Sequence, residues 1–118
     1  MKKKSLLIGG IGLVLLVIFL AGCAPIGVPV VTAVIDLINR KATISWTPVL
    51  GAKQYYVYYS ENSSSTYNPF PSNSVVTTTS ITWPNPPRGV YIFKVKAANS
   101  VGESALSPPS LPLYVVLP

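Results

Sequence analysis

Tyr91-Ile92-Phe93-Lys94-Val95-Lys96-Ala97 alternates between two kinds of side chain. The odd-numbered positions are all aromatic or aliphatic, and two of the three even-numbered positions are lysines. A period of two residues is typical of a β-strand that buries one face and exposes the other. This stretch therefore predicts a sheet with a core on one side, and other strands of the chain must supply the opposite side of that core.

The same alternation occurs twice earlier in the chain. The apolar faces there consist of Ala42, Ile44 and Trp46 in residues 41–47, and of Tyr55, Val57 and Tyr59 in residues 54–60. We expect further strands at residues 30–34 and 75–83, an edge segment at 66–71, and a proline-broken last strand at 103–117. No helical periodicity follows residue 23, and short strands separated by turn residues predict an antiparallel β-sandwich.

Several of these residues resemble a fibronectin type III domain over roughly residues 28–117. They are Trp46 with Pro48, the run Tyr55, Val57 and Tyr59, and the series Tyr91, Phe93, Val95, Ala97, Asn99, Gly102, Ser104 and Ser107. The resemblance implies an all-β, immunoglobulin-like sandwich of about seven strands after an N-terminal signal segment. Its core would contain Trp46, Tyr55, Val57, Tyr59, Tyr91, Phe93 and Val95, and the Tyr91 hydroxyl would bond to backbone in the preceding corner.

Two departures from this family pattern limit what the resemblance implies about the structure and function of this chain. The family usually places a Leu about six residues before the corner tyrosine, whereas Trp83 lies eight residues before Tyr91. The sequence also has no Arg-Gly-Asp integrin motif, so no cell-adhesion function is implied.

The first 23 residues have the composition of a targeting segment. Three lysines at positions 2–4 precede the uncharged residues 5–22, and Leu20-Ala21-Gly22-Cys23 follows the densest apolar run. A charged start, an apolar core and a small-residue exit form the secretory signal pattern. Leu-Ala-Gly-Cys resembles the bacterial lipobox, which implies a diacylglycerol thioether on Cys23. About 18 apolar residues also suffice to span a bilayer, so an uncleaved anchor is the alternative.

These patterns divide the chain into a signal peptide at 1–22, a lipidated Cys23 with a short tether to residue 29, and a domain at 30–118. Removing residues 1–22 from the 118-residue chain leaves 96 residues and lowers the side-chain charge from +6 to +3. Such a weak, scattered charge argues against a nucleic-acid partner. Ala24 favours the outer membrane in a cell with two membranes, because the lipoprotein pattern often uses Asp there for inner-membrane retention.

The sequence offers little for catalysis or for holding a metal or cofactor. It contains no histidine, its three acidic residues lie in separate turns, and its one cysteine is expected to carry lipid. Neither a paired-carboxylate site nor a Cys/His site can be assembled. We therefore expect a non-catalytic protein without a cofactor or metal, whose only expected covalent group is the lipid on Cys23.

Three surfaces are candidates for binding. The first is the outward face of the third and penultimate strands, made of Tyr56, Tyr58, Ile92, Lys94 and Lys96; the alternative is ordinary cross-strand Tyr–Lys packing. The second is the apolar end of the chain, residues 113–117, which could pair with a strand of a partner at the edge of the sheet. The alternative is that these residues form the last core strand of the sandwich. Tyr67 and Phe70 form the third.

The function expected from the sequence is a membrane-anchored binding or scaffold module of the bacterial cell envelope. Its partner would be a protein or a glycan. One alternative is a carbohydrate-associated module working with a separate glycan-degrading enzyme, and another is a structural subunit assembling through the C-terminal strand.

Replacing the sulfur tests the expected anchor. Cys23→Ser should abolish labelling by radioactive palmitate and block normal leader cleavage, because the thioether needs the cysteine sulfur. The wild-type chain, expressed in parallel, is the positive control. If labelling persists in the variant, or never occurs in the wild type, the leader is only a membrane span.

Overall fold

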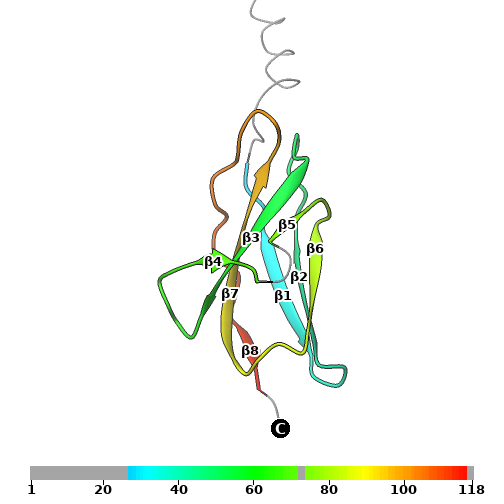
Figure 1. The fold of residues 1–118 in the computed structure, drawn as a ribbon, viewed down its shortest axis with the longest axis vertical. Coiled ribbons are helices and arrows are strands. Elements are labelled where there is room, and N and C mark those ends of the chain that lie inside the picture. The colour runs from blue at the N-terminus through cyan, green and yellow to red at the C-terminus, as the bar shows by residue number, and fades with distance from the viewer. Residues whose placement is uncertain (1–26, 72–73, 117–118) are drawn as a thin grey trace, which may run out of the picture.

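The computed structural model describes residues 27–71 and 74–116, which form two antiparallel sheets packed face to face (Figure 1). The three-stranded sheet has the order β1-β2-β6, with β1 at Val31–Asp36, β2 at Lys41–Trp46 and β6 at Ser80–Pro84. The other sheet contains β4 (Asn68–Pro69), β3 (Gln54–Glu61), β7 (Gly89–Ala98) and β8 (Leu113–Val115), with β5 (Val75–Val76) also paired to β3. The expected all-β antiparallel sandwich is confirmed.

The leader and Cys23 lie outside the described residues. Among residues 27–71 and 74–116, no helix is long and apolar enough to cross a membrane. Pro29, expected in the tether, is fully buried, and the Val30 N–H donates to Thr47 Oγ1 at 2.9 Å. Among the described residues, packing of the domain therefore begins at residue 29.

The single strand expected at residues 75–83 is wrong. The chain forms β5 against β3 in one sheet and then β6 against β2 in the other. Thr77, Thr78 and Thr79 are exposed between the two strands. A continuous β-branched run indicates strand propensity at every position, but it carries no signal for the point at which the chain changes sheets. Of the last strand expected at residues 103–117, only Leu113–Val115 forms a strand, because prolines interrupt the preceding segment. Elsewhere the strands differ from expectation mainly in their ends, since β1 continues to Asp36 and β3 to Glu61.

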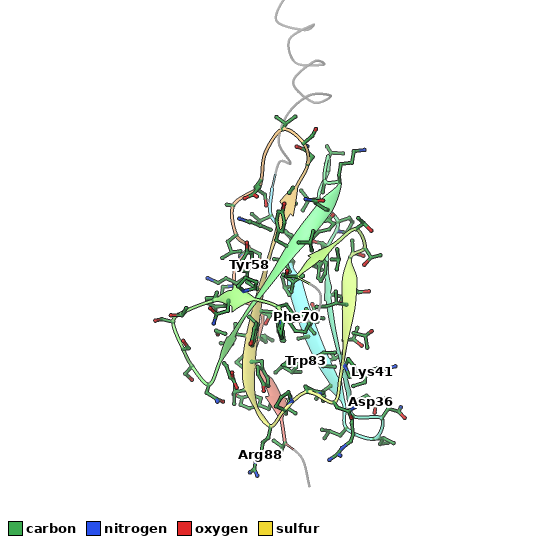
Figure 2. All side chains as sticks on the ribbon, viewed as in Figure 1. Asp36, Lys41, Tyr58, Phe70, Trp83 and Arg88 are labelled. Atoms are coloured by element: carbon green, nitrogen blue, oxygen red, sulfur yellow. The ribbon has the colours of Figure 1, made fainter. Side chains whose placement is uncertain are left out.

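The core lies between the two sheets. Trp46, Tyr55, Val57, Tyr91, Phe93 and Val95 are buried, whereas Tyr59 is half-buried and packs against the core. Phe70, a binding candidate in the sequence, is only 2% exposed and belongs to this core. Its ring lies 5.1 Å from that of Trp83 in an edge-to-face contact, and Figure 2 places both between the sheets. β4 brings Phe70 inward, which the proline-interrupted sequence around it did not reveal.

The corner before β7 is closed by a tyrosine hydroxyl. Tyr91 Oη donates to the carbonyl of Pro87 at 2.8 Å. Trp83 packs on the Tyr91 ring with the centroids 4.9 Å apart, so the aromatic residue eight positions upstream contacts the corner tyrosine. A Cβ at position 89 would approach Tyr91 Oη to 3.2 Å and Asn62 Oδ1 to 3.3 Å. These contacts are tight, which explains why glycine occupies this position.

The outer edge of β7 is paired mostly by serines rather than by a regular strand. Ser104, Ser107 and Ser110 each donate a backbone N–H to the carbonyl of Ala97, Val95 and Phe93, respectively, at 2.7–2.9 Å. Their hydroxyls accept the N–H groups of the same three β7 residues at 2.8–2.9 Å. Each serine thus satisfies both backbone groups of one β7 residue. This serine ladder lets a segment interrupted by Pro108 and Pro109 cover a strand edge.

The serine ladder predicts that removing one serine hydroxyl lowers the stability of the fold measurably. Ser107→Ala should lower the free energy of unfolding by about 1–3 kcal/mol, because the buried Val95 N–H loses its acceptor. Denaturant unfolding followed by tryptophan fluorescence measures the change.

The matched control is Ser100→Ala in the exposed 99–102 turn, which should change the stability by less than about 0.5 kcal/mol. Equal stability of the Ser107 variant and the control would contradict the ladder.

Candidate functional site

The outward face of β3 and β7 gathers the five residues of the first binding candidate. The antiparallel register sets Tyr56 opposite Lys96, Tyr58 opposite Lys94, and Ser60 opposite Ile92. Side chains on alternate residues of paired strands point to the same face, so these residues lie side by side. All five candidates are half-buried, and Tyr58 is visible on this face in Figure 2. We call this surface, together with Tyr67, the Tyr–Lys face.

Both lysines lie over aromatic rings. Lys94 Nζ is 4.4 Å from the ring centroid of Tyr67, and Lys96 Nζ is 5.6 Å from the centroids of both Tyr56 and Tyr58. A cation within about 6 Å of a ring centroid is attracted by the ring quadrupole. Tyr67, expected with Phe70 in a separate candidate, therefore belongs with the lysines, while Phe70 turns into the core.

A carboxylate neutralises one lysine of the pair. Lys96 Nζ lies 2.7 Å from Glu103 Oε1, with the two side chains 23% and 48% exposed. This hydrogen bond to Glu103 raises the pKa of Lys96, and a bond to Tyr58 acts in the same direction. In the part of the chain that the structure describes, Lys94 forms no ion pair. Lys94 is thus the cation that this face offers to a partner.

The sequence did not reveal the role of Glu103. Glu103 follows the 99–102 turn and forms an isolated bridge with Ala98, which brings its side chain back along β7 toward Lys96. The only available signal was the short separation of Lys96 and Glu103 across a turn.

The Tyr–Lys face offers aromatic and charged groups for contact with a partner. Its groups are phenol hydroxyls, ring edges, two ammoniums and one carboxylate, and Gln54 Nε2 donates to Tyr56 Oη at 2.8 Å. Because the lysines cover the ring faces, less flat aromatic surface is left for stacking on a sugar. The uncompensated ammonium of Lys94 favours a partner with acidic groups.

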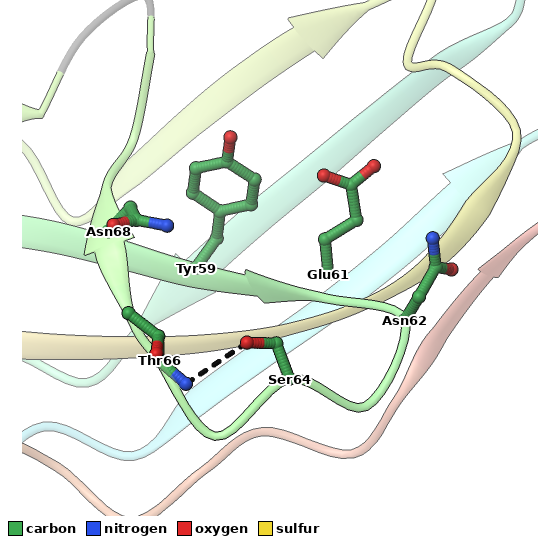
Figure 3. Close-up of a pocket in the computed structure, with 6 residues that line it drawn as sticks. All are labelled: Tyr59, Glu61, Asn62, Ser64, Thr66 and Asn68. Carbon is green, nitrogen blue, oxygen red and sulfur yellow. Dashed lines mark hydrogen bonds between the residues drawn. The ribbon is translucent and has the colours of Figure 1, made fainter.

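A pocket lies where β3 enters the loop before β4. This pocket of about 290 Å³ is lined by Tyr59, Glu61, Asn62, Ser64, Thr66 and Asn68 (Figure 3). Glu61 also helps to raise the pKa of the neighbouring Tyr91 phenol, although burial of the phenol is the larger cause. The ionisable groups that line this pocket are the carboxylate of Glu61 and the phenol of Tyr59. Among the described residues, no three metal-ligating side chains lie together.

The end of the chain alternates between core and solvent. Leu113 and Val115 are buried while Tyr114 and Val116 are exposed. Residues 113–115 form β8 at the edge of the five-stranded sheet, and Leu117 lies outside the described residues. Leu113 and Val115 therefore belong to the core, and only Tyr114 and Val116 of the described residues in this candidate remain available to a partner.

Comparisons with solved structures identify the fold as that of fibronectin type III domains. A Fn3-like protein from Clostridium thermocellum matches with a TM-score of 0.59 and 25% identity, over 79% of this chain and 92% of that one. The FN1–FN3 domains of chicken CNTN1 match with a TM-score of 0.62 and 25% identity, over 81% of this chain and 35% of theirs. A structure of FN3tt matches with a TM-score of 0.56 and 22% identity, over 77% and 92%. No family sequence model and no curated protein sequence matches this chain.

The ion pair on the face predicts the titration of Lys96. Glu103→Gln should lower the pKa of Lys96 toward its ordinary value, because the charged hydrogen-bond acceptor is lost. Because the native pKa is raised, the pair stabilises the fold at neutral pH, and this contribution disappears as the pH rises through the pKa of Lys96. Glu103 is half-exposed, so the contribution should not exceed about 1 kcal/mol.

NMR titration of the Lys96 side-chain carbon signals measures this pKa. Glu61→Gln removes a carboxylate from the other end of β3 and is the control. An unchanged Lys96 pKa in Glu103→Gln would show that the pair does not form in solution.

Proposed function

We propose that this protein is a membrane-anchored, non-catalytic binding module of the bacterial cell envelope, and that the Tyr–Lys face is its contact surface. The fold itself commonly serves as a binding or scaffold module. Because one fold can carry many functions, the specific role is argued from the chain's own residues.

The observation that carries the proposal is the closeness of the expected anchor to the domain. Only Ala24, Pro25 and Ile26 separate Cys23 from Gly27, and packing of the sandwich begins at Pro29. A lipid on Cys23 would therefore hold the sandwich at the membrane surface. Two or more acyl chains suffice for stable anchoring, since each buried methylene contributes about 0.8 kcal/mol.

The Tyr–Lys face is assigned as the contact surface because it carries an unpaired cation and because paired strands hold its side chains in place. β3 and β7 are paired over eight residues, so the side chains of the Tyr–Lys face other than Tyr67 are held on a rigid pair of strands. An ammonium held over an aromatic ring loses less freedom on binding than a free lysine. The covered ring faces and the free charge of Lys94 favour an acidic protein surface over a neutral sugar.

The C-terminal edge supports a second candidate, a structural subunit that assembles through β8. β8 is an edge strand, its Tyr114 is exposed, and Leu111 and Val116 are exposed on either side of it. An exposed strand edge can pair with a strand of another chain. The prolines at 108, 109 and 112 oppose such pairing by removing N–H donors along this edge.

A pull-down with the intact lipidated chain separates these functions. Tyr58→Thr combined with Lys94→Thr should lose the captured partner, because it removes a ring and the free ammonium from the face while keeping strand-compatible residues. Tyr114→Thr combined with Lys41→Thr alters an exposed tyrosine and an exposed lysine elsewhere and should retain the partner. Thermal melts of both variants verify that each is folded.

Each result has a distinct meaning. Loss of the partner only in the Tyr114 variant would favour assembly through β8 and contradict the Tyr–Lys face. Recovery of the wild-type chain outside the membrane fraction would contradict the anchor.

A further inference from the structure

Three segments meet at the end of the sandwich where the described chain begins. They are residues 27–30, the 47–53 loop between β2 and β3, and the 99–102 turn after β7 (Figure 1). The Thr47 N–H donates to the Val30 carbonyl at 3.1 Å, and the Lys53 N–H donates to the Ala98 carbonyl at 2.8 Å. We call this end the N-terminal platform.

One side chain joins the two loops of the platform. Asn99 Nδ2 donates to the Gly51 carbonyl at 3.0 Å, while Asn99 Oδ1 accepts the Val101 N–H at 2.8 Å. The carbonyl of Gly51, which follows Leu50, and the N–H of Val101 are thus both bonded to the side-chain amide of Asn99. The loops are held together as one surface.

The platform presents apolar side chains to solvent. Leu50 is 75% exposed and Val101 is 59% exposed, each at the tip of its loop. The exposed Lys53, in the same loop as Leu50, adds a cation to the platform. Apolar tips rimmed by a cation are the composition of an interfacial membrane contact.

No unpaired carboxylate of the described residues opposes such a contact. Asp36 lies at the opposite end of the sandwich (Figure 2), and Glu61 ends β3 in that same half. Glu103 is near the platform, but Lys96 neutralises it. An anionic lipid surface would therefore meet the cation Lys53 without a free acid beside it.

We propose that the N-terminal platform rests on the bilayer surface, with the side chains of Leu50 and Val101 entering the interfacial layer. This inference depends on the proposed membrane anchor at Cys23. Four residue steps separate Cys23 from Gly27, which limits their separation to about 14 Å. The anchor thus holds the platform against the lipid headgroups, and the strands of the sandwich point away from the membrane.

The opposite end of the sandwich provides a matched control. Ile38, at the tip of the turn between β1 and β2, is 92% exposed, and the cations Arg40, Lys41 and Arg88 lie at the same end. That end also presents an exposed aliphatic side chain and cations, together with the carboxylates of Asp36 and Glu61, but it lies far from the anchor. A contact driven by composition alone would favour Ile38, whereas a contact set by the anchor favours Leu50.

Spin labels distinguish the two ends. The lipidated full-length chain is reconstituted into phosphatidylethanolamine–phosphatidylglycerol vesicles as Leu50→Cys, Val101→Cys or Ile38→Cys, and each new thiol is labelled. The wild-type chain, whose sulfur is expected to carry lipid, gives the background. Power saturation then compares collisions with oxygen, which concentrates in the bilayer, and with a water-soluble nickel complex.

The proposal expects the oxygen-to-nickel accessibility ratio to be several-fold higher at Leu50 and Val101 than at Ile38. Equal ratios, or a higher ratio at Ile38, with the chain still floating with the vesicles, would overturn the platform contact alone. Failure of the wild-type chain to float would overturn the anchor, and the platform contact with it.

Discussion

The antiparallel pairing of β3 with β7 is the constraint on which the rest of the molecule depends. It runs through eight residue pairs, from Gln54 opposite Ala98 to Glu61 opposite Tyr91. Because side chains alternate along a strand, this single register sends one set of residues into the core and the other onto the Tyr–Lys face. A slip of one residue would bury lysines and expose Phe93 and Val95.

The backbone N–H and C=O groups along the second edge of β7 are hydrogen-bonded in an unusual way for a sheet. The serine ladder supplies an acceptor and a donor to alternate residues of β7 without a continuous strand. Prolines between the serines remove N–H groups from the outer side of the segment. The sheet therefore ends in a segment that stabilises β7 yet offers few backbone donors to another chain.

The alternation at residues 41–47, 54–60 and 91–97, with turn residues between the strands, predicted the sandwich, because a buried face imposes a period of two on any strand that contributes to it. The same reasoning placed Tyr56, Tyr58, Lys94 and Lys96 on the outward sides of their strands, and the family resemblance implied that these two strands are neighbours. The reasoning from alternation failed for Phe70, because the two-residue β4 that precedes it is too short to show a period. It also failed for residues 75–83, where threonines obscure the passage between sheets. The Lys96–Glu103 pair also escaped prediction, because it depends on the path of a turn.

The central claim is that β7 is hydrogen-bonded along both edges, with the core on one face and the Tyr–Lys face on the other. Native-state hydrogen exchange of the backbone amides tests it most directly. Amides bonded to the serine hydroxyls, those of Phe93, Val95 and Ala97, should exchange only through global unfolding, as slowly as the β7 amides bonded to β3. Exchange of these three amides as fast as that of Ser100 in the exposed turn would contradict the account.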